Sequence, residues 1–131
     1  MGDRPVVEGS KQLLDKVGPQ KFAEWMGNER RVLLTYTTMR DGHQSLLATR
    51  VRTYDIARVA NAYAQALPNL FSLACWGGAT FHVSMRFLTV HPWERLAMVR
   101  DGAPTILLHM PLRGAPAAVS NTYPGPVVRA F

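Results

Sequence analysis

The stretch TYTTMRDGHQSLL, residues 35–47, decides how this sequence is interpreted. It overlaps the end of an apolar run that starts at Val32 and predicts a β-strand over 32–38. The turn after the strand carries side chains of four different chemistries: Arg40, Asp41, His43 and Gln44. Parallel α/β proteins place binding and catalytic groups at this end of a strand. A guanidinium can grip a carboxylate and a carboxylate can ligate a metal ion, so the segment predicts a ligand site.

The composition predicts one globular domain with a positive charge. The chain has 131 residues, of which 47% are hydrophobic and 18% charged, and its formal net charge is +6. The cations are scattered from Arg4 to Arg129 without a long run, which favours a solvated face or substrate-binding groups over a nucleic-acid stripe. Non-specific binding to polyanions stays open as an alternative.

Cysteine usage indicates a reducing compartment. Cys75 is the only cysteine, so no internal disulfide can form, and its apolar neighbours predict a buried structural thiol. No apolar run approaches the roughly 18 residues of a membrane span. The first residues, MGDRPVVEG, resemble neither a secretory nor a transit peptide. We therefore expect a cytoplasmic location.

Strand and helix signals alternate along most of the chain. Two short helices, one capped by Ser10, are expected before the first strand, separated at Gly18-Pro19. Further strands are expected over 70–76 and 105–112. Helices are expected from Thr53 to Leu67, around Phe81, Met85 and Leu88, from Pro92 with Trp93, Leu96 and Ala97 facing inward, and near Val127. This order predicts an α/β fold with a parallel sheet and right-handed crossovers.

The three expected strands deliver polar or small residues at the same edge of the sheet. The groups after the strands are Arg40, Asp41 and Gln44, then Gly77, Gly78 and His82, then Arg113. A (β/α)₈ barrel builds its site in this way. The consecutive apolar residues of the first strand also indicate a strand covered on both faces.

These residues resemble a known family. The segments RVLLTYTTMRDGHQSLLATRVRT, LPNLFSLACWGGATF, MRFL, PWERL and MPLRGA are similar to the start of the carboxyltransferase domain of the pyruvate carboxylase family. The lead-in GSKQLLDKVGPQKFAEWM is similar to the segment that precedes that barrel. Related enzymes such as the oxaloacetate decarboxylase α subunit share RDGHQS, but the lead-in and LPNLFS favour pyruvate carboxylase.

The resemblance implies a partial (β/α)₈ barrel, about three parallel strands of eight, preceded by short helices. Residues 1–30 would be a helical lead-in and residues 31–131 a truncated barrel segment. The implied reaction moves a carboxyl group from carboxybiotin, held on a separate biotinylated carrier domain, to pyruvate, giving oxaloacetate. Asp41 would ligate a divalent metal such as Zn or Mn, and Arg40, Gln44 and Arg113 would bind pyruvate.

Departures from the family pattern argue against activity of the chain by itself. The family usually has acids at the positions of Tyr36, Ala74 and His82, and Pro111 falls inside the expected third strand. The family's carboxylated Lys and His-x-His ligands have no counterpart here. We expect an incomplete and inactive segment, or alternatively an interaction module that docks onto a barrel or self-associates through exposed sheet edges.

Plainer interpretations stand beside the functional ones. Arg40 and Arg113 could be solvated surface cations, and Gln44 could cap backbone groups. His43 is expected to be a structural loop histidine, and His82 a tolerated substitution. Gly77-Gly78 could let backbone approach a ligand or could form a tight turn before a helix.

Overall fold

The computed structural model describes residues 8–48, 50–111 and 124–130. Its helices and strands are, in chain order, α1 (Ser10–Asn28), β1 (Thr35–Tyr36), the π-helical turn η1 (Thr38–Gly42), α2 (His43–Ser45), α3 (Thr53–Ala66), β2 (Ser72–Ala74), α4 (Gly78–Arg86), α5 (Pro92–Gly102), β3 (Leu107–His109) and α6 (Gly125–Ala130). No helix within these ranges is long and apolar enough to cross a membrane.

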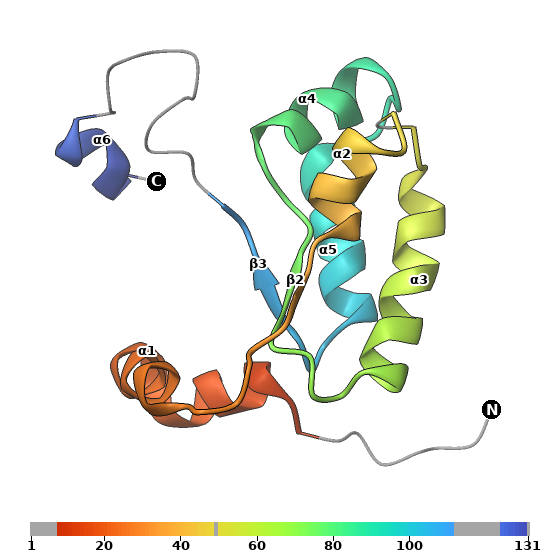
Figure 1. The fold of residues 1–131 in the computed structure, drawn as a ribbon. Helices are drawn as coiled ribbons and strands as arrows, with labels where there is room; N and C mark the ends of the chain where they lie inside the picture. The colour runs from red at the N-terminus through yellow and green to blue at the C-terminus, as the bar shows by residue number, and fades with distance from the viewer. Residues whose placement is uncertain (1–7, 49, 112–123, 131) are drawn as a thin grey trace.

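The three strands form one open parallel sheet in the order β1-β2-β3. Thr35 pairs with Ser72, and Ser72 pairs in turn with Leu107. Helices α3, α4 and α5 lie together on one face of the sheet (Figure 1). The predicted parallel α/β arrangement is therefore confirmed, and it is consistent with a segment of an α/β barrel.

The core lies between the sheet and the pair α3 and α5. Leu73 of β2, Ala60 of α3 and Val99 of α5 are each at most 1% exposed. A Cβ on Gly102 would lie 3.2 Å from the Cβ of Ala60, so a residue without a side chain allows the two helices to approach closely. The small residues on both helices thus set the packing that covers β2.

Helix α1 closes the amino-terminal ends of β2 and β3. The Ser10 hydroxyl donates to the Phe71 carbonyl at 2.6 Å and accepts from the Leu107 amide at 3.2 Å. Gly9, not Ser10, is the N-cap, so the predicted capping role of Ser10 is wrong: its hydroxyl ties the helix to the two strands instead. The predicted break at Gly18-Pro19 appears as a kink, with Gly18 at φ 78°.

Several strand predictions need correction. Strand β1 has only two residues, and the apolar residues before it, Val32 and Leu34, are 84% and 63% exposed rather than covered on both faces. Pairing needs a hydrogen-bonded neighbour, and β1 has one such neighbour among the described strands. Strand β3 ends at His109, so Pro111 lies beyond the strand and removes no bond from its pairing with β2.

The apolar faces predicted for two helices are only partly confirmed: Leu96 of α5 packs against the core as predicted. In α4 the buried residues are Thr80, Val83 and Ser84, whereas Met85 is 44% exposed. In α5 they are Pro92, Arg95 and Val99, whereas Trp93 is 55% exposed. Trp93 stacks on Trp76 at 5.0 Å between ring centroids, and Trp76 is itself packed against the core. Trp93 thus lies on a core-bound ring rather than in the core.

Candidate functional site at the carboxyl edge of the sheet

The turn after β1 is a tight π-helical turn rather than the expected loop. The carbonyl of Thr37 accepts hydrogen bonds from the amides of Arg40, Asp41 and Gly42 at 3.1, 2.8 and 3.2 Å. Gathering three amides on one carbonyl turns the chain sharply at the end of the strand. Such π-helical turns are frequent at functional sites. The turn therefore presents Arg40 and Asp41 next to each other at the carboxyl end of β1.

The Arg40 side chain lies beside the carboxyl ends of both β1 and β2. It is 18% exposed, and its Nη1 lies 3.2 Å from Oδ1 of Asp41. A Cβ on Gly77, the residue before α4, would lie 3.1 Å from Arg40 Nε. The missing side chain at Gly77 thus leaves room for the guanidinium beside the end of β2. Gly77 also caps α4 with extended backbone, so the predicted turn before a helix is confirmed, whereas the approach of a ligand to this backbone stays a prediction.

His43 holds the turn from inside the molecule. Its side chain is 2% exposed, and its Nε2 accepts a hydrogen bond from the Val51 amide at 3.1 Å. Burial, with a smaller effect of Arg95, lowers the pKa of His43. A neutral ring is the form that can accept this bond. The prediction that His43 is structural is therefore confirmed.

Arg95 is a buried cation that the sequence analysis did not single out. It is 2% exposed, and neither of its Nη atoms has a hydrogen-bond acceptor in the part of the chain that the structure describes. Burial lowers the pKa of Arg95, and burial raises the pKa of its neighbour Cys75 to about 11. Cys75 is 4% exposed, as predicted for a structural thiol. The signal for Arg95 was available: it lies three residues after Pro92 and four before Val99, at core spacing.

The residues predicted to bind a metal or substrate are only partly brought together. The Asp41 side chain is 58% exposed. Gln44 lies on α2 and His82 on α4, and both side chains are exposed. No group of three or more His, Cys, Asp or Glu side chains that could hold a metal ion occurs within the described ranges. A single carboxylate does not fit a divalent metal site, which needs several ligands. Arg113 lies outside the described residues.

The similarity of this chain to known proteins is extensive. No family model matches it. The carboxyl transferase domain of Rhizobium etli pyruvate carboxylase with pyruvate is 67% identical, with a TM-score of 0.83 over 98% of this chain and 22% of that one. The same domain with oxalate is 71% identical, with a TM-score of 0.82 over 87% of this chain and 19% of that one. This chain is homologous to part of pyruvate carboxylase.

Curated relatives give the same result at lower identity. Pyruvate carboxylase of Bacillus subtilis is 46% identical over 129 residues, which is 98% of this chain and 11% of that protein. The mitochondrial enzyme of Rattus norvegicus is 48% identical over 127 residues, or 97% of this chain and 11% of that protein. The chain thus spans about a tenth of the length of these relatives, within the carboxyltransferase domain. The family and the barrel-segment fold implied by the sequence are confirmed.

Replacing the buried guanidinium should stabilise the fold. Arg95→Met removes a desolvated charge without an acceptor and keeps an unbranched side chain, so the free energy of unfolding should rise by about 1–3 kcal/mol. Urea unfolding followed by circular dichroism measures this change. Arg100→Met, at an exposed position of the same helix, is the matched control and should stay within about 0.5 kcal/mol of the parent. A lower stability of Arg95→Met would contradict this view of Arg95.

Proposed function

We propose that this chain supplies the pyruvate-binding edge of a carboxyltransferase that moves a carboxyl group from carboxybiotin to pyruvate, giving oxaloacetate. The observation that carries the proposal is the position of Arg40. Its largely buried guanidinium lies where the carboxyl ends of β1 and β2 meet. A guanidinium there can donate two hydrogen bonds to a small carboxylate. The similarity to a domain solved with pyruvate and with oxalate supports the same assignment.

Each residue of the proposed site has a distinct task. Arg40 binds the pyruvate carboxylate and favours the negative charge that develops as pyruvate becomes an enolate. Asp41, 3.2 Å from the guanidinium, orients it. Gln44, on the next turn of the chain, offers an amide to the same ligand. Arg113 is proposed to contribute a second cation from the segment after β3.

The proposed reaction needs biotin and a divalent metal, and the described residues do not form a complete site for either of them. Biotin on a separate carrier domain would supply the carboxyl group, and a divalent metal such as Zn or Mn belongs to the family's chemistry. Asp41 is the one described residue proposed as a metal ligand. The activity therefore belongs to a longer assembly, in which residues 1–30 form a helical lead-in and residues 31–131 part of a barrel. A cytoplasmic location stays a proposal, because relatives include bacterial and mitochondrial enzymes.

Oxalate binding tests the role of Arg40. Arg40→Met should abolish detectable binding of oxalate, measured by isothermal titration calorimetry, because it removes the donor pair. Gly77→Ala should weaken binding by about tenfold, since its Cβ would lie 3.1 Å from Arg40 Nε and displace the guanidinium. Gly78→Ala is the matched control: its Cβ would meet nothing within 4 Å. Equal oxalate affinities of all three variants and the parent would refute the proposal.

The chain alone is expected to be catalytically inactive. Purified chain supplied with carboxybiotin and pyruvate should form no oxaloacetate above the rate without protein, as measured by coupled reduction with malate dehydrogenase. The reason is that Asp41 is the one proposed metal ligand among the described residues, and one carboxylate cannot hold the metal of this chemistry. Oxaloacetate formation that depends on the chain, and that Arg40→Met abolishes, would overturn this expectation.

Association through the open sheet is a second candidate, favoured by one observation. Val32 and Leu34 are 84% and 63% exposed where the chain enters β1, and the outer side of β1 has no partner strand among the described residues. Exposed apolar residues beside an unpaired edge favour association.

Light scattering tests this second candidate. The mass in solution should exceed 14.6 kDa and rise with concentration. Leu34→Glu should return it to the single-chain value, because a charge at the edge opposes pairing. Leu67→Glu, at a 43% exposed position after α3, is the control. A single-chain mass at every concentration would remove this candidate.

A further inference from the structure

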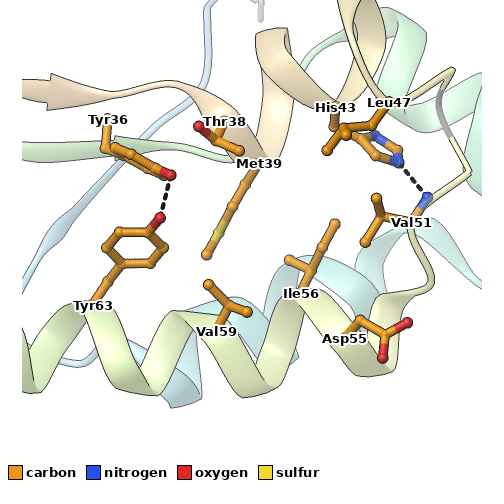
Figure 2. A pocket seen from close by; sticks show the side chains of 10 residues that line it. All are labelled: Tyr36, Thr38, Met39, His43, Leu47, Val51, Asp55, Ile56, Val59 and Tyr63. Atoms are coloured by element: carbon orange, nitrogen blue, oxygen red, sulfur yellow. Dashed lines mark hydrogen bonds between the residues drawn. The ribbon is translucent and has the colours of Figure 1, made fainter.

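A cavity of about 160 Å³ lies between α3 and the turn that follows β1. Figure 2 shows Met39 pointing into it from the turn, and Val59 and Ile56 pointing into it from α3. The paired rings of Tyr36 and Tyr63 lie at one end and His43 at the other. Arg40 does not line this cavity, so it is separate from the proposed pyruvate site.

The polar side chains at the two ends are already engaged. The Tyr63 hydroxyl donates to the Tyr36 hydroxyl, and burial together with this bond raises the pKa of Tyr63 to about 12. The Nε2 of His43 is occupied by the Val51 amide. Thr38 and Asp55 also line the cavity, and the Asp55 carboxylate accepts from the Arg52 guanidinium. A buried water needs two to four polar partners, and few of these groups are left to serve it. The cavity is thus poorly suited to water or to an anion and better suited to an apolar occupant.

We propose that this cavity is a binding site for a compact, neutral, single-ring aromatic molecule. Its volume is close to the roughly 150 Å³ of an enclosed apolar cavity that binds benzene in another protein, but this cavity opens to the solvent. The thioether of Met39 adds a favourable contact with a ring. Leu47 and Val59, 46% and 45% exposed, form its mouth. The proposal is independent of carboxyl transfer.

Fluorobenzene is the probe for this site. Titrated into the full chain, it should give saturable changes in the fluorine signal of the probe and in the methyl signals of Met39 and Ile56. Val59→Phe fills the mouth and should weaken binding at least about tenfold. Val127→Phe makes the same substitution on α6 at a position 39% exposed, outside the cavity, and should bind like the parent.

Two results would overturn the proposal. One is a linear, non-saturating response, or changes centred on exposed residues such as Val32 and Leu34, which would indicate non-specific contact. The other is an unchanged affinity in Val59→Phe. If Val59→Phe does not fold, a measurement on the parent chain alone tests the proposal. Nuclear Overhauser contacts between fluorobenzene and the Met39 methyl group are expected. Their absence at saturating fluorobenzene would contradict the site.

Discussion

Strand β2 is hydrogen-bonded on both sides, to β1 and to β3, and every one of its residues is buried. Because all three strands run in the same direction, their carboxyl ends meet at one edge. This pairing is the constraint on which the rest depends: it places the turn that carries Arg40 beside Gly77, although 37 positions of sequence separate them. Helices α3 and α5 cover one face of the strand, and Ser10 fixes its amino-terminal end.

Local signals predicted the elements well, and tertiary contacts explain where prediction failed. Pro92 starts α5 because its ring fixes φ, and Gly18 interrupts α1 because glycine readily adopts the positive φ of the kink. Strand length and helix rotation depend on neighbours, and no local pattern encodes them. The apolar run at Val32 therefore predicted a longer β1 than the structure has, and Trp93, predicted to face the core, stacks on Trp76 and is 55% exposed.

In the candidate site too, features set by local sequence could be predicted and features set by tertiary contacts could not. The turn with Arg40 and Asp41 could be located from sequence, since it directly follows a strand signal and carries the motif shared with pyruvate carboxylase. The spacing of Arg95 to Pro92 and Val99 placed it on the buried face of α5. The cavity beside Tyr36 could not be located, because it forms where segments from distant parts of the chain pack together. Pairing of Tyr36 with Tyr63 is the clearest case: two tyrosines far apart in sequence form one end of that cavity.

The direction of strand pairing is the most direct test of this account. Nuclear Overhauser contacts between backbone protons distinguish parallel from antiparallel neighbours, because only antiparallel strands bring facing Cα protons close together. The account predicts amide-to-Hα contacts for Thr35 with Ser72 and for Leu73 with Leu108, without strong Hα-to-Hα contacts. Strong Hα-to-Hα contacts between these strands would contradict the parallel sheet and the shared edge built on it.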